Sequence, residues 1–165
     1  MRSRRNLRLA TAAATGVVAM LLMFGCSAST ATRQSKVAER GAQVMPFDLD
    51  ATTHTFTDMA DGGIQRVTAD DPSDARQVAL IRQHLRREAR RFAVGNFSDP
   101  ARIHGMKMPG VAELRSHYDQ VRVTYAAQSS GARITYSTDD PALVTAIHRW
   151  FERQLVDHGD QAQSG

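Results

Sequence analysis

The stretch TTHTFTDMADGGIQRVTADDPSDARQVALIRQHLRREARRF, residues 52–92, decides the fold. Its first half holds two runs rich in threonine, aromatic and β-branched residues, around 54–57 and 64–69. Asp61-Gly62-Gly63 lies between these runs, and such a cluster between two strand-like runs is typical of a hairpin turn. The first half therefore predicts a β-hairpin.

The second half of the stretch predicts a helix. Asp71 can cap its start, Pro72 fits the first turn, and Asp74 lies where the helix dipole favours a negative charge. Apolar residues then recur every three or four positions, which places them on one buried stripe. The stripe consists of Val78, Ile81, Leu85, Ala89 and Phe92.

The same order of elements recurs near the C-terminus. Alternating apolar residues at 121–125 and 134–136 flank Ser129-Ser130-Gly131, and Asp139-Asp140-Pro141 then opens a helix with the stripe Leu143, Ile147 and Phe151. Two such units predict an α+β fold in which a four-stranded antiparallel sheet carries two long helices on one face. The connection at 95–117 is long enough for short helices, starting near Ser98 and near Met108.

The N-terminus predicts export and lipidation. Residues 1–25 read as a lipoprotein signal peptide, because a basic segment with four arginines precedes an apolar run that is short for a membrane span. Leu22-Met23-Phe24-Gly25-Cys26 resembles a bacterial lipobox, so Cys26, the chain's single cysteine, is the expected lipidation site. The alternatives are an ordinary signal peptide or an uncleaved anchor. Ser3-Arg4-Arg5-Asn6-Leu7 resembles a twin-arginine motif, and the choice between Sec and twin-arginine export stays open.

This N-terminal export and lipidation signal predicts a lipid-anchored protein of the cell envelope that faces the periplasm or the exterior. Ser27 after the cysteine resembles the signal for delivery to the outer membrane, where the cell has one. Four of the 21 basic residues lie in the leader, which has no acid, so 17 basic and 17 acidic residues remain. A near-neutral mature protein argues against a nucleic-acid partner.

The remaining chain divides into three parts. Residues 26–44 are small and polar without an apolar period, which indicates a flexible tether. Residues 45–159 are enough for one α+β domain with its own core, and residues 160–165 are expected to be a disordered tail.

His104-Gly105-Met106-Lys107-Met108, in the long connection, is the leading candidate site. Thioethers suit Cu(I), and imidazole binds copper or zinc, so His104, Met106 and Met108 together predict a transition-metal site, with copper preferred. The alternative is that the methionines fill the core and that Met108 staples the next helix.

Two further histidines are candidates to complete such a site. His84 and Glu88, like His148 and Glu152, are four residues apart on a predicted helix and therefore share a face. Both histidines border the predicted apolar stripes, and a hydrogen-bonded or ion-paired helix surface is the favoured explanation because arginines surround both pairs. His54 is expected to be a buried, hydrogen-bonded histidine on a strand. His158 precedes Gly159 at a helix end, where the dipole accounts for it without a ligand.

No motif for nucleophilic catalysis is present: the sequence lacks Gly-x-Ser-x-Gly, HExxH, a phosphate-cradling glycine loop and a thiol in the domain. The segments MPFDLDATTHTF, ADGGIQRVTADD, NFSDPARIHG, MPGVAELR and IHRWFERQLVDHG resemble a family of small exported bacterial proteins that often carry the label aspartate carbamoyltransferase. The resemblance covers about residues 45–159 and implies a name more than a mechanism. Transcarbamoylases bind carbamoyl phosphate with a Ser-Thr-Arg-Thr loop, whereas here Ser29-Thr30-Ala31-Thr32-Arg33 is interrupted and lies in the predicted tether.

The sequence therefore leaves three hypotheses. The first is an envelope lipoprotein that binds copper or zinc. The second is a structural or interaction lipoprotein that docks an envelope protein through its sheet. The third is an enzyme, including the labelled transcarbamoylase, and this is the least supported by motifs.

Overall fold

A computed structural model describes residues 18–165 of the 165-residue chain, with side chains described from residue 28 onward. Of the predicted signal peptide, residues 1–17 lie outside the described residues. Cys26 falls within the first helix, in the part whose side chains are not described.

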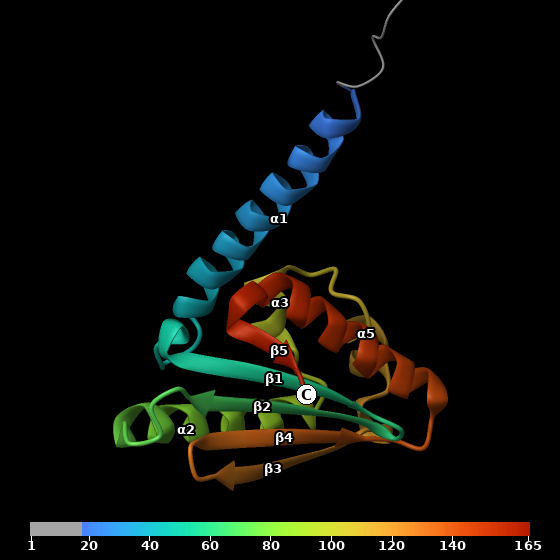
Figure 1. Ribbon diagram of the computed structural model, residues 1–165. Helices are drawn as coiled ribbons and strands as arrows, with labels where there is room; N and C mark the ends of the chain where they lie inside the picture. Colours follow the sequence, from blue (N-terminus) through green and yellow to red (C-terminus); the bar gives the residue numbers. More distant parts are fainter. Residues whose placement is uncertain (1–17) are drawn as a thin grey trace, which may run out of the picture.

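The domain is α+β and is built on a five-stranded sheet of order β3-β4-β2-β1-β5 (Figure 1). Both predicted hairpins are present. They meet through their second strands, because β2 pairs with β4 in an antiparallel register. The strands are β1 (Thr52–Met59), β2 (Gly62–Ala69), β3 (Arg122–Gln128), β4 (Gly131–Ser137) and β5 (Ala162–Ser164).

The fifth strand corrects the predicted four-stranded antiparallel sheet. β5 runs parallel to β1, so the sheet is mixed, and it is formed by the segment 160–165 that was expected to be disordered. The three residues Ala162, Gln163 and Ser164 carry no alternation that could mark a strand. They are held by the edge of β1, where the backbone N–H of Gly165 donates to the Phe56 carbonyl and the Gln163 amide to the Thr55 hydroxyl.

Helices α2 and α5 cover one face of the sheet, as predicted, and bury their apolar stripes there. Trp150 of α5 links the two helices to the sheet. Its ring centroid lies 5.7 Å from that of Phe92 on α2 and 5.4 Å from that of Tyr136 on β4, and both contacts are edge to face. The two expected short helices, α3 and α4, fill the connection. The α-helices are α1 (Val18–Ala42), α2 (Ala75–Phe92), α3 (Ser98–His104), α4 (Val111–Ser116) and α5 (Pro141–His158).

Helix starts follow the predicted chemistry with one correction. Asp140 caps α5 by accepting from Ala142, and Pro141 occupies the first position. Asp71, however, does not cap α2. Its carboxylate accepts from Ser73 within a turn, and Asp74 caps the helix by accepting from the Gln77 backbone. A turn after Asp71-Pro72 thus delays the helix by three residues.

Helix α1 corrects the expected flexible tether. Its sequence holds five alanines, the residue with the highest helix propensity, and the C-terminal part of the helix docks on the domain. Val37 is buried at 2% exposure, and Arg33 and Arg40 reach the α3 and α5 region. Figure 1 shows the N-terminal part of α1 extending away from the domain. Among the described residues, none of the helices combines the length and hydrophobicity needed to cross a bilayer.

Candidate functional site

A cavity of about 40 Å³ lies between the sheet and the helices, and histidines from four elements line it. His54 comes from β1, His84 from α2, His104 from α3 and His158 from the last turn of α5. The rings form a chain, with centroids 5.0 Å apart between His54 and His158 and 5.0 Å apart between His158 and His104. We call this space the histidine cavity. Histidines that are 20 to 104 positions apart in the sequence thus share one small interior space.

Unpartnered polar atoms gather around the histidine cavity. Within the described residues, six buried side-chain nitrogen or oxygen atoms have no hydrogen-bond partner in the protein, and five belong to residues that line this cavity. Such an atom costs about 1–3 kcal/mol unless a bound species satisfies it. The five are His54 Nδ1, Glu88 Oε2, Trp150 Nε1, Gln154 Oε1 and His158 Nδ1.

A buried carboxylate orients the ring of His104. Asp157 is fully buried, and its Oδ2 lies 2.9 Å from His104 Nδ1. Burial alone would raise the pKa of Asp157, but hydrogen bonds from His104 and Arg33 hold this pKa below its ordinary value. The Asp157 carboxylate is therefore ionised and accepts a hydrogen bond from the Nδ1–H of His104. In the neutral imidazole this leaves the lone pair of His104 on Nε2, the arrangement found in metal-binding and base histidines.

The Asp157 carboxylate also ties α1 to the cavity. Arg33 of α1 donates from Nε to Oδ1 at 2.6 Å and from Nη2 to Oδ2 at 2.9 Å, and the same guanidinium reaches the His104 carbonyl at 3.2 Å. Arg153 adds a contact to Oδ1 at 2.7 Å. Bidentate pairs of this kind are directional as well as strong, so the helix that carries Cys26 is connected to the residue that orients His104.

The other histidines of the cavity are neutral near pH 7. Burial, followed by the positive charge of His104, lowers the pKa of His54 to about 4. Burial, followed by Arg87, lowers the pKa of His84 to about 4. Burial also holds the pKa of His158 well below its ordinary value. Neutral imidazoles offer a lone pair to a metal ion or to a hydrogen-bond donor.

The tautomer of His84 follows from its partner. Arg87 Nη2 lies 2.9 Å from His84 Nδ1, and a guanidinium can only donate, so Nδ1 accepts and Nε2 carries the proton. His84 is thus already engaged at Nδ1.

Glu88, beside His84 in the cavity wall, is a carboxyl group with an unusual pKa. Burial, followed by the charge of Asp99, raises the pKa of Glu88 to about 7, while Arg91 works in the opposite direction. Asp99 is held in turn by Arg91, whose Nη1 lies 2.6 Å from its Oδ2. Glu88 is therefore close to half protonated at neutral pH and can donate or accept a hydrogen bond.

The structure brings together only part of the predicted metal set. His84 and His104 both line the histidine cavity, but Met106 is 76% exposed at the surface and Met108 is buried in the apolar core. His148 lies elsewhere, where its Nε2 donates to the carbonyl oxygens of Met59 and Gly62 beside the β1–β2 turn. The alternation in His-x-Met-x-Met therefore sends the three side chains in different directions.

Sequence reasoning gave His54 and His158 structural roles and missed their proximity. His54 is buried as expected, but its Nδ1 has no partner, and His158 points into the cavity rather than only ending a helix. The available signal was that both lie on faces that also carry buried aromatic residues. Only the pairing of β1 with the other strands and the docking of α5 bring the two rings together.

Neutral imidazoles, a carboxyl group and an amide are a donor set that zinc and copper accept. In the part of the chain with described side chains, no three histidine, aspartate, glutamate or cysteine side chains already converge on one point as a finished metal site. Binding a metal would therefore require the imidazole rings of the cavity to rotate.

No known protein family, curated protein or solved structure matches this chain. The function is therefore inferred from the geometry of the histidine cavity and from the N-terminal sequence.

Proposed function

We propose that the protein is a lipid-anchored protein of the bacterial cell envelope whose domain binds a transition-metal ion, zinc or copper, in the histidine cavity. The observation that carries the binding part is the clustering of five unpartnered buried polar atoms around one cavity, two of them imidazole nitrogens. An interior that bears this much unsatisfied polarity is suited to a polar or charged occupant.

The spacing of the rings agrees with a shared ion. A zinc–nitrogen bond of about 2.0–2.1 Å and a further distance of about 1.2 Å to the ring centre put each centroid about 3.2 Å from the metal. Two imidazoles at a tetrahedral angle then have centroids about 5.2 Å apart. His158 lies 5.0 Å from both His54 and His104, so each of these two ring pairs has the centroid spacing of two imidazoles on one ion.

The ligand set differs from the one that the sequence favoured. We propose His54, His104 and His158 as ligands, with the Gln154 amide oxygen or Glu88 completing the sphere. Asp157 orients His104 from behind, as a second-layer carboxylate does in known zinc sites. Without Met106 and Met108 the preference for Cu(I) is lost, and the site suits zinc or Cu(II).

Metal analysis of the full-length protein, purified in detergent and dialysed against zinc or copper, tests the binding. One ion per chain is expected, with affinity at least tenfold weaker in His158→Gln. His117→Gln removes an exposed histidine as the matched control and should bind like the wild type. Circular dichroism of each variant separates loss of binding from loss of folding, and a wild-type protein that retains no metal at micromolar concentrations refutes the proposal.

The anchor has its own test. Radiolabelled palmitate should enter the wild-type protein in cells and should not enter Cys26→Ala, which is expected in the soluble envelope fraction. Unlabelled wild-type protein recovered at full length from the cytosol would contradict the anchor and leave the metal result unaffected.

The enzyme hypothesis gains no geometric support. The string that might replace the carbamoyl phosphate loop, Ser29 to Arg33, lies inside α1, and its arginine is engaged by Asp157. The resemblance to the family labelled aspartate carbamoyltransferase remains a proposal, and failure to turn over carbamoyl phosphate and aspartate would end its enzymatic version.

A further inference from the structure

Helix α2 concentrates positive charge. Its 18 residues hold six arginines and one glutamate, a net charge of +5, although basic and acidic residues are equal in number after the leader. The glutamate, Glu88, is buried on the inner side and cannot neutralise the outer face. The overall amino-acid composition therefore does not account for the positive charge of α2.

Four of these arginines surround one surface hollow, together with Ala79 and Gln83. Arg82, Arg86 and Arg90 follow one another at intervals of four, so they form a row along the helix with a rise of about 6 Å per step. Like charges at this spacing destabilise a helix by about 0.2–0.5 kcal/mol per pair. Arg87 borders the row and is the fourth lining arginine. We call this surface the arginine hollow.

The guanidinium groups of the hollow are already ordered by the domain. Arg82 donates to the carbonyl oxygens of Gln128, Ser129 and Gly131 at the tip of the β3–β4 hairpin, at 2.5 to 3.3 Å. Arg86 lies over the ring of Tyr125, with its guanidinium carbon 5.2 Å from the centroid. Side chains held in this way lose little further entropy when they bind a ligand.

The hollow keeps unneutralised charge. Among the ion pairs formed by residues 28–165, none involves Arg82, Arg86 or Arg90, while Arg87 shares Glu88 and Asp99 with Arg91. The guanidinium groups of Arg82, Arg86 and Arg90 thus have no carboxylate partner. A row of fixed, unpaired cations produces a local potential that attracts anions.

We propose that the arginine hollow binds inorganic polyphosphate, a linear chain of repeated phosphates. The planar guanidinium fork matches phosphate oxygens, and the exposed forks of Arg86 and Arg90, with the added charge of Arg82, match a chain with repeated phosphates better than a single small anion. The domain's own membrane is the less suitable source, because Figure 1 shows α2 on the side of the domain remote from the free end of α1. This site is separate from the proposed metal site.

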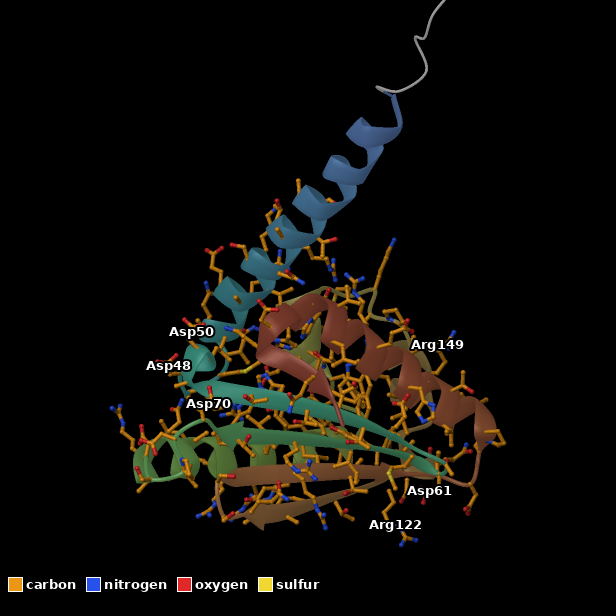
Figure 2. The ribbon with its side chains drawn as sticks, viewed as in Figure 1. Asp48, Asp50, Asp61, Asp70, Arg122 and Arg149 are labelled. Carbon is orange, nitrogen blue, oxygen red and sulfur yellow. The ribbon has the colours of Figure 1, made fainter. Side chains whose placement is uncertain are left out.

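Binding of short-chain inorganic polyphosphate to the full-length protein in detergent tests the assignment. The variant Arg86→Gln/Arg90→Gln removes two exposed arginines that have no ion-pair partner. Its affinity at about 50 mM salt should fall at least tenfold, and the slope of log K against log salt should decrease by about 1 to 2. The matched control is Arg122→Gln/Arg133→Gln, which removes the same charge from exposed positions on strands β3 and β4. Figure 2 shows Arg122 at the outer edge of the sheet, and this control should stay within twofold of the wild type.

Three results would overturn the proposal. The first is no binding of polyphosphate by the wild type at low salt. The second is an equal loss in the two double variants, which would mean that net charge alone attracts the polymer. The third is tighter binding of poly-glutamate, of single-stranded DNA or of anionic phospholipid vesicles than of polyphosphate, because each of these assigns the hollow to another class of partner. Metal content, measured on the same samples, should be unchanged in both double variants.

Discussion

Replacing His84 by glutamine should make the metal-free protein more resistant to acid. The His84 pKa is lowered from 6.5 to about 4 in the folded protein by burial and then by Arg87, so between these two values the unfolded chain binds the proton more tightly. Stability is therefore unaffected by this residue above about pH 6.5 and is lost as the pH falls toward 4. At pH 5 the two pKa values give a loss of about 2 kcal/mol.

Glutamine isolates this contribution because its amide oxygen can still accept from Arg87. The pH dependence of wild-type stability alone is insufficient, because the contribution of Glu88 to it has the opposite sign. Its pKa is raised to about 7, so the folded state takes up its proton first and gains stability as the pH falls from 7 toward 4.5. Subtracting the pH dependence of His84→Gln stability from that of the wild type cancels the contribution of Glu88, which both proteins share.

Urea unfolding with EDTA at pH 7.5, 6, 5 and 4.5 measures the effect. The free energy of unfolding of the wild type should fall by about 2 kcal/mol more than that of His84→Gln between pH 7.5 and 5. His117→Gln, at an exposed position, serves as the control and should follow the wild type. If wild type and His84→Gln lose the same stability over this range, His84 is not a buried neutral histidine and the electrostatic description of the cavity fails.

Three further changes probe the docking of α1, the α3–α4 turn and the cavity wall. Asp157→Asn weakens the bidentate contact with Arg33 and should cost about 1–3 kcal/mol, and limited proteolysis should then cut α1 faster than in the wild type. Gly110→Ala should prevent folding or cost several kcal/mol, because Gly110 has φ +77° and a Cβ there overlaps the Ala146 carbonyl. Gly105→Ala is the comparison, because Gly105 has φ +97° but lies in open space, and it should cost only about 1 kcal/mol in thermal unfolding. Trp150→Phe removes an unpartnered N–H and should cost less than about 1.5 kcal/mol by urea unfolding, whereas a larger loss would indicate that the N–H is satisfied in solution.

The sequence predicts those parts of the fold that are recorded in local periodicity. The stripe on α2 repeats every three or four residues, and the β3–β4 hairpin alternates apolar and polar residues, so each element can bury only one face. Asp140-Pro141 marks the start of α5 because cap and first-turn chemistry depend on two adjacent residues.

The parts that the sequence does not predict depend on neighbours. Strand β5 is three residues long and exists because the edge of β1 offers free hydrogen-bonding groups. Helix α1 has no continuous apolar stripe, and its docking depends on Val37 and on an arginine whose partner is 124 residues away. No window along the chain contains both members of that pair.

The candidate site illustrates the same limit. His104, Met106 and Met108 are close in sequence, and that closeness suggested a common site, although successive side chains around a helix end diverge. His54, His104 and His158 are far apart in sequence and meet because β1, α3 and the end of α5 surround the same space. The separation that hides such a cluster from sequence reasoning is also what fixes it in the fold, since each histidine is carried by a different element.

The free-energy cost of the unpartnered polar atoms decides whether the histidine cavity can be dry. Five unpartnered atoms at about 1–3 kcal/mol each amount to about 5–15 kcal/mol, which equals the whole stability of an ordinary domain. A folded protein therefore fills the cavity, and about 40 Å³ is room for a few water-sized species. The Trp150 N–H only donates and cannot be satisfied by a cation, so the proposed metal would account for acceptor atoms of the cavity but not for this donor.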